Sequence, residues 1–184
     1  MNRDTNDDAL AAFIEQARRA FGPLTTDVVA SVRTQLEQLA KTPSTERWLE
    51  ALHAEAAVSK ELHRDGTHGF ILLAHSEPTG LYRPPHDHGR GWVVYALQRG
   101  EMEIGTYARV NDAQTGVRLV KRDASLLRAG EARVYLPGDI HDTRCVSGPS
   151  LLFRFTERDL KREDQERRLT RYVTRDGVWT VPPV

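Results

Sequence analysis

The sequence has a single cysteine among its 184 residues, Cys145, so no disulfide forms within the chain and no metal site is built from several thiolates. No apolar run approaches the roughly 20 residues that a membrane-spanning helix needs. Neither sign of charge is in excess, because Lys plus Arg and Asp plus Glu both number 26. The basic footprint of a nucleic-acid-binding protein is therefore missing. We predict a soluble chain that has neither nucleic acid nor a membrane as a partner.

The length and the amino terminus indicate the number of domains and the location of the protein. A chain of 184 residues is most simply one structural domain with room for a hydrophobic core. Residues 1–8 are polar and acidic, which is unlike a secretory signal. We therefore expect a cytoplasmic protein, and the sequence leaves open whether it is a monomer or a homodimer.

Residues 1–57 are predicted to form a helical extension that packs on the rest of the chain. Residues 10–21 and 28–39 carry apolar side chains at three- and four-residue spacing, and a Gly-Pro pair separates the two patterns. Thr25 or Thr26 is placed to cap the second helix, and residues 44–46 are expected to cap a third.

Residues 58–157 have the pattern of an all-β barrel. Short apolar or alternating runs are broken by turn residues at intervals of about 8–12 residues, as in sandwiches and barrels. In residues 158–184 we expect a charged helix over residues 160–168 and a hairpin turning at Asp176-Gly177, a strong two-residue turn signal. The expected strands are 62–63, 69–75, 83–88, 93–98, 101–110, 116–121, 132–136, 142–146 and 151–156.

Three histidines form a candidate metal site. His86 and His88 are one residue apart, and His141 follows a Pro137-Gly138 turn. In a strand, His86 and His88 would project to one side and Asp87 to the other, with the two histidine α-carbons roughly 6.6 Å apart. That separation allows both imidazoles to reach one ion. Asp87 is then expected to have a structural role.

Glycines flank these histidines in a way that resembles the two motifs of the cupin superfamily. The first motif runs from Gly80 through His86-x-His88 to Gly100, and the second from Gly130 to His141. The resemblance covers roughly residues 58–156. It implies a cupin double-stranded β-helix, a jelly-roll barrel, and the helical leader suits the same family.

The position at which the first cupin motif usually has a glutamate ligand is occupied by Val93, or by Trp92 if the gap is one residue shorter. The chain is therefore similar to the three-histidine thiol dioxygenases, the group that includes cysteine dioxygenase. This resemblance implies a mononuclear Fe(II) held by His86, His88 and His141, and an enzyme that transfers both atoms of O2 to the sulfur of a small mercapto acid, giving a sulfinate. Imidazole ligands alone also suit other divalent transition metals.

The chain departs from cysteine dioxygenases after the third histidine. Their Ser-x-His-x-Tyr series is absent from residues 152–158, so no tyrosine from that strand assists catalysis, and cysteine itself is disfavoured as the substrate. The catalytic residues beyond the metal ligands stay unassigned.

Four residues are weaker candidates for binding the substrate. Arg154 would offer a cation to a carboxylate if alternate residues of its strand face the lumen; otherwise it is an outer residue paired with a surface acid. Lys60 matches the position of a carboxylate-binding arginine in relatives, but an ordinary solvated lysine fits equally. Arg83 and Tyr82 flank the histidine strand and are placed to line the mouth. His75 is a further inward-facing candidate on its strand.

Two other functions stay open on the sequence alone. Three-histidine sites also serve cupin oxygenases and hydrolases that act on substrates without a thiol. A cupin that binds a metal or a small anion without turnover is the third possibility.

Overall fold

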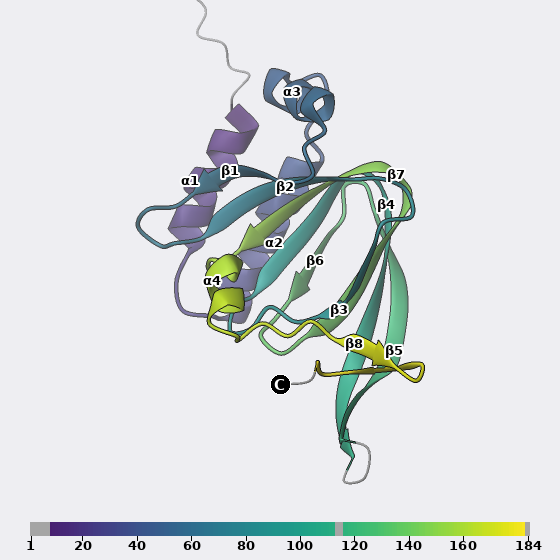
Figure 1. Cartoon of the computed structure of the whole chain (residues 1–184). Helices are drawn as coiled ribbons and strands as arrows, with labels where there is room; N and C mark the ends of the chain where they lie inside the picture. Colours follow the sequence, from purple (N-terminus) through teal and green to yellow (C-terminus); the bar gives the residue numbers. More distant parts are fainter. Residues whose placement is uncertain (1–7, 113–115, 183–184) are drawn as a thin grey trace, which may run out of the picture.

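The computed structural model describes residues 8–112 and 116–182. Three helices precede a β-barrel, and a short helix and a two-stranded hairpin follow it (Figure 1). The elements are α1 (Asp8–Ala20), α2 (Thr26–Ala40), α3 (Arg47–Glu55), β1 (Lys60–Arg64), β2 (Ile71–Glu77), β3 (Tyr82–His86), β4 (Val93–Asp112), β5 (Gly116–Arg128), β6 (Ala132–Tyr135), β7 (Ile140–Thr156), α4 (Leu160–Gln165), β8 (Val173–Arg175) and β9 (Val178–Thr180).

The barrel is one antiparallel sheet that curls around a lumen. Its strands follow the order β1-β2-β7-β4-β5, while β3 pairs with β7 and β6 pairs with β4. The first half of β7 lies beside β3 and its second half beside β2, so β7 connects the two walls. The predicted fold class is confirmed: an all-β jelly-roll barrel with a helical leader.

Two pairs of predicted strands are each a single strand. Residues 93–98 and 101–110 are parts of β4, and residues 142–146 and 151–156 are parts of β7. The strand β5 is also longer than the predicted 116–121, since it continues to Arg128. Gly100, which lies in the predicted break between residues 98 and 101, has a φ of 88° and lies among register shifts of the β4–β7 ladder. It therefore bends the strand as a bulge instead of ending it.

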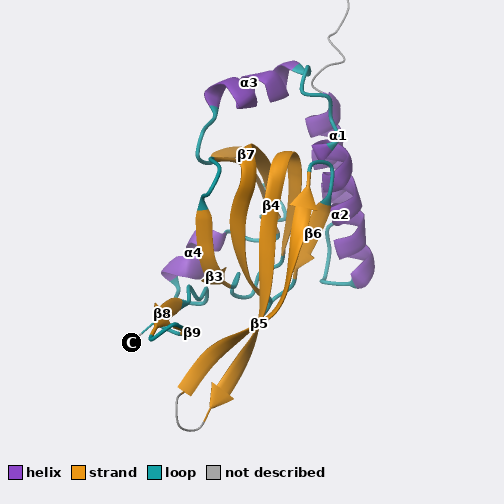
Figure 2. Ribbon diagram, turned by 90° about the vertical axis from the view of Figure 1, so that its right-hand side faces the viewer, coloured by secondary structure: helices purple, strands orange, loops and turns teal. Residues whose placement is uncertain are grey.

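Alternation along the strands produces two cores. Val94, Ala96, Phe153 and Phe155 point outward and pack against the helices, whereas Val93, Tyr95, Leu97 and Leu152 point into the barrel. Figure 2 shows α1 and α2 along one side of the barrel and α4 on the opposite side. The helices cover the wall formed by β4 and β7, so these strands are apolar on both faces. A polar side chain that points from this wall into the lumen is therefore a candidate for a functional role.

One predicted helix cap is confirmed, and two other predicted ends of helices are corrected. Thr25 caps α2, with its hydroxyl accepting a hydrogen bond from the Val28 amide at 3.3 Å. The third helix begins instead after Glu46, and neither Ser44 nor Thr45 caps it. The helix α4 ends at Gln165, before residue 168, because Arg167 adopts a left-handed φ of 55°.

The carboxy-terminal hairpin is confirmed. Arg175 pairs with Val178, so Asp176 and Gly177 are the two turn residues, and both have positive φ as a type I′ turn requires. Within the described ranges, no helix combines the length and the apolar character that crossing a membrane requires.

Candidate metal centre

The three histidines meet at one end of the lumen. His86 ends β3 and pairs with His141 across the β3–β7 ladder, so their side chains share a face. The strand was predicted to continue to His88, but His88 lies in the turn that follows. The turn nevertheless returns its ring to the other two. Ring centroids are 4.7 Å apart for His86 and His141, 4.9 Å for His88 and His141, and 5.4 Å for His86 and His88.

The environment of these rings suits a metal ion. One nitrogen from each histidine lies within 4.8 Å of the others. His88 and His141 are 1% and 0% exposed, and neither nitrogen of His141 nor Nδ1 of His88 has a hydrogen-bond partner among the described residues. Buried polar atoms without partners are costly, and a shared cation would satisfy them.

The protonation state of the three histidines also fits. Burial lowers the pKa of His86, and it holds the pKa values of His88 and His141 well below the usual range. The rings are therefore neutral at physiological pH, which is the form that coordinates metals. The His86 Nδ1–H donates to the Pro84 carbonyl at 2.9 Å, which leaves the Nε2 lone pair for a metal.

Two tyrosines that the sequence analysis missed line the same end of the lumen. The hydroxyl of Tyr95, on β4, lies 3.4 Å from Nε2 of His88. The ring of Tyr135, on β6, lies 3.8 Å from the His141 ring between centroids. Burial raises the pKa of both tyrosines, so both hydroxyls stay protonated. Tyr95 is two residues after Val93 and therefore points into the barrel as Val93 does. Strand alternation could have predicted this orientation from the sequence.

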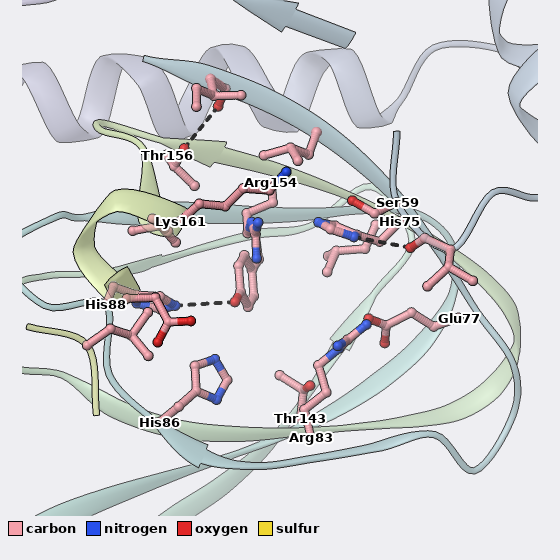
Figure 3. A pocket seen from close by; sticks show the side chains of 18 of the residues that line it. Ser59, His75, Glu77, Arg83, His86, His88, Thr143, Arg154, Thr156 and Lys161 are labelled. Carbon is pink, nitrogen blue, oxygen red and sulfur yellow. Dashed lines mark hydrogen bonds and ion pairs between the residues drawn. The ribbon is translucent and has the colours of Figure 1, made fainter. Parts of the chain in front are cut away.

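A cavity of about 530 Å³ opens beside the histidines (Figure 3). His86 and His88 line it, together with His75, Arg83 and Arg154. Apolar walls come from β2 and β7, and one side is formed by residues after β7. The cavity is large enough for a small organic substrate.

Arg154 lies inside this cavity. Leu152, Arg154 and Thr156 all line it, so their strand does present alternate residues to the lumen. Arg154 is opposite Tyr95 in the β4–β7 ladder, and its Nε is buried without a hydrogen-bond partner among the described residues. The cation lowers the pKa of the neighbouring histidines, after the larger effect of burial. Arg154 therefore contributes a positive charge to the cavity wall.

The other candidates are placed differently. Arg83 and Tyr82 both line the cavity, but Arg83 Nε donates to Glu77 Oε1 at 2.8 Å and the Tyr82 hydroxyl donates to Asp142 Oδ2 at 2.9 Å. Lys60 is not among the cavity residues, since it forms an ion pair with Glu55 at the end of α3. Its predicted role as the carboxylate-binding residue does not fit this position.

His75 is buried in the cavity wall. Its Nδ1 lies 3.3 Å from the Val58 carbonyl, and Nε2 is buried without a described partner. Burial, with a smaller contribution from Arg154, lowers the pKa of His75 to about 3. The ring is therefore neutral at physiological pH, and its Nε2 is a hydrogen-bond acceptor.

Known structures align with only part of this chain. No protein-family model matches the chain, and no curated protein matches it significantly. Among solved structures, KdgF from Halomonas sp. aligns with a TM-score of 0.41 and 18% identity over 53% of this chain and 74% of its own. The Cnp3 cupin domain of Schizosaccharomyces pombe aligns with a TM-score of 0.43 and 10% identity over 59% and 69%. A Klebsiella pneumoniae protein with a double-stranded β-helix domain aligns with a TM-score of 0.37 and 17% identity over 52% and 66%.

Proposed function

We propose that this protein is a mononuclear non-haem iron dioxygenase that oxidises the thiol of a small mercapto acid to a sulfinate. The observation that carries the proposal is the composition of the site. Three neutral imidazoles converge, and the cluster contains no carboxylate or thiolate. The barrel brings the three histidines together, and the set of ligands is what favours thiol oxidation.

The charge of the site favours an anionic thiol. Three neutral ligands would leave a divalent ion with its full charge, and such a centre gains more from an anionic ligand than a site with a carboxylate does. Arg154 adds a second positive charge, and its Nε is buried without a hydrogen-bond partner among the described residues. A mercapto acid has a thiolate for the metal and a carboxylate for Arg154.

An iron ion held by His86, His88 and His141 would supply the redox chemistry and lower the pKa of the thiol. The overall reaction is RSH + O2 → RSO2− + H+, in which sulfur is oxidised and both oxygen atoms are retained. The protein contributes binding and electrostatics. Arg154 orients the carboxylate, and the Tyr95 hydroxyl offers a hydrogen bond beside His88.

Oxygen uptake tests the proposal directly. Protein loaded anaerobically with Fe(II) is mixed with a panel of mercapto acids, and O2 consumption and sulfinate formation are measured. We expect consumption of one O2 per sulfinate formed, and no activity in His86→Ala. Loaded protein that consumes no O2 with any thiol would reject the assignment.

The same experiment distinguishes the alternatives. The position of Arg154 in the cavity wall also favours a site that binds a small anion without turnover, and such a protein would bind the mercapto acid but consume no O2. Oxygen consumption with a substrate that has no thiol would instead favour another type of cupin oxygenase.

A further inference from the structure

The segment after the barrel is bonded directly to the turn that carries His88. We call residues 85–91 the ligand loop and residues 159–172 the strap. The Asp87 amide donates to the Thr170 carbonyl at 3.1 Å, and the Tyr172 amide donates to the Pro85 carbonyl at 2.9 Å. The Asp87 carboxylate accepts hydrogen bonds from the Thr170 amide at 2.9 Å and the Gly89 amide at 3.0 Å. The two segments therefore form a small backbone ladder.

A buried acid makes the second connection. Glu163 of α4 is 2% exposed, and its Oε2 accepts from the Arg90 amide at 3.1 Å and from Arg168 Nε at 3.0 Å. Its Oε1 accepts from Arg168 Nη2 at 3.0 Å, and Arg158 Nη1 lies 3.8 Å away. The Arg168 hydrogen bonds, with help from Arg90, lower the pKa of Glu163 to about 2. A permanently charged side chain of the strap therefore holds the backbone of the ligand loop.

The contact between the two segments is tight. Gly89 has a φ of 62°, and a Cβ at this position would lie 2.7 Å from Glu163 Oε2 and 3.2 Å from the Arg168 carbonyl oxygen. Both atoms are fixed, the first by Arg168 and the second by being backbone. Only glycine allows the loop to approach the strap this closely.

This contact has a consequence for His88. His86 and His141 are held by strands that pair with each other, whereas His88 lies beyond the end of β3, where no ladder of the barrel reaches it. The amides on either side of it, those of Asp87, Gly89 and Arg90, bond to Thr170, Asp87 and Glu163. The position of this third histidine is thus fixed by the strap and by Asp87.

We propose that Glu163 and Asp87 are positioning residues of the metal centre, which hold the ligand loop so that His88 meets the other two histidines. The inference rests on the metal site of the proposed function but not on its thiol chemistry. Residues that orient metal ligands typically contribute about 10- to 100-fold to metal affinity. Loosening the strap should therefore weaken metal binding while the barrel stays folded.

Cobalt(II) is a suitable probe, because its visible spectrum reports the coordination geometry. We would titrate Co(II) into the wild-type protein, Glu163→Gln and Asp87→Ala, with Glu166→Gln as the matched control. Glu166 is an exposed acid of the same strap and pairs with Arg162 and Arg168, not with the ligand loop. We expect the dissociation constant to rise about 10- to 100-fold in the two test variants, and the spectrum at saturation to change. Glu166→Gln should match the wild type.

Hydrogen exchange in the metal-free protein supplies an independent readout. Amides of the ligand loop should exchange faster in Glu163→Gln, while those of β4 and β7 should be unchanged. If Glu163→Gln does not fold, Gly89→Ala takes its place. This substitution keeps the hydrogen bonds between Glu163 and Arg168 and displaces only the ligand loop.

Folded variants that bind Co(II) within twofold of the wild type would overturn the inference. So would a lower melting temperature with an unaltered affinity and spectrum, since the role would then be structural only. Wild-type protein that binds no divalent metal would overturn this inference together with the metal centre. Metal binding without thiol oxidation would overturn only the proposed reaction.

Discussion

The Tyr95 hydroxyl lies 3.4 Å from Nε2 of His88, and the two residues come from different segments of the barrel. β4 supplies the phenol, and the turn after β3 supplies the imidazole. The sequence excludes a tyrosine from the strand after His141, yet the fold brings one to the histidines from another strand. A protonated hydroxyl beside the histidine cluster is a hydrogen-bond donor for a substrate or for O2.

Removing this hydroxyl should affect turnover more than binding. Tyr95→Phe keeps the ring that packs in the barrel core, and we expect its kcat for thiol oxidation to fall about 100-fold, the cost of losing one well-placed donor. Metal content, measured by elemental analysis, should stay stoichiometric. Steady-state oxygen uptake that equals the wild type would exclude a catalytic role for Tyr95.

Arg154 should determine the affinity for acidic thiols. Arg154→Gln removes the cation, and a charged hydrogen bond is worth about 1.5–3 kcal/mol, so we expect KM for a mercapto acid to rise about 10- to 100-fold. Lys60→Gln is the matched control, because Lys60 pairs with Glu55 outside the cavity. If both variants raise KM equally, or if a thiol without a carboxylate loses as much as the acid, Arg154 does not recognise the carboxylate.

His75 should make the folded state sensitive to acid. Burial lowers its pKa in the folded protein to about 3, from an ordinary value near 6.5. Below pH 6.5 the unfolded chain binds a proton that the folded chain does not, so stability falls by about 1.4 kcal/mol per pH unit until the loss is complete near pH 3. Above pH 6.5 this group has no effect.

Urea denaturation of the metal-free protein between pH 7.5 and pH 5 would measure that slope. The three clustered histidines act in the same direction, so the comparison is with His75→Gln, whose slope should be shallower by one proton. Equal slopes would mean that His75 is not buried as a neutral ring.

Metal removal should lower the melting temperature. A ligand that binds only the folded state stabilises it by about 2.7 kcal/mol when present at 100 times its dissociation constant. For a chain of this size that corresponds to roughly 5–10 °C. Treatment with a chelator should produce this decrease in the wild type and no decrease in His86→Ala, as followed by calorimetry. A chelator that leaves the wild-type transition unchanged would argue against a bound metal.

Some features of the site could be predicted from local patterns. The spacing of His86, His88 and His141 predicts their convergence. Period-two alternation predicts that Leu152, Arg154 and Thr156 share one face, but it left open whether that face is the lumen, as the structure shows. The place of Lys60 was not predicted. It matches a binding position in relatives, but it pairs outside the cavity with Glu55, five residues earlier at the end of α3. No sequence pattern singled out this ion pair, because it forms only when the chain leaves the helix and enters β1.

The strap is the clearest case. The sequence predicts a charged helix after the barrel, but nothing in it indicates that Glu163 is buried against the turn that carries His88. That contact joins residues more than seventy positions apart, and it exists because α4 lies on the side of the barrel opposite α1 and α2, next to the ligand loop.

The sequence by itself determined the fold class and the histidine trio, because strand alternation and glycine-flanked histidines act over a few residues. Only the tertiary structure decided which other groups surround the trio. Strand alternation turns Tyr95 and His75 inward, but which inward side chains lie beside the trio, and that Glu163 holds the ligand loop, depend on how the sheet closes and what covers it. Closure of the sheet and packing of the helices depend on contacts between residues far apart in the chain, so no short stretch of sequence predicts them.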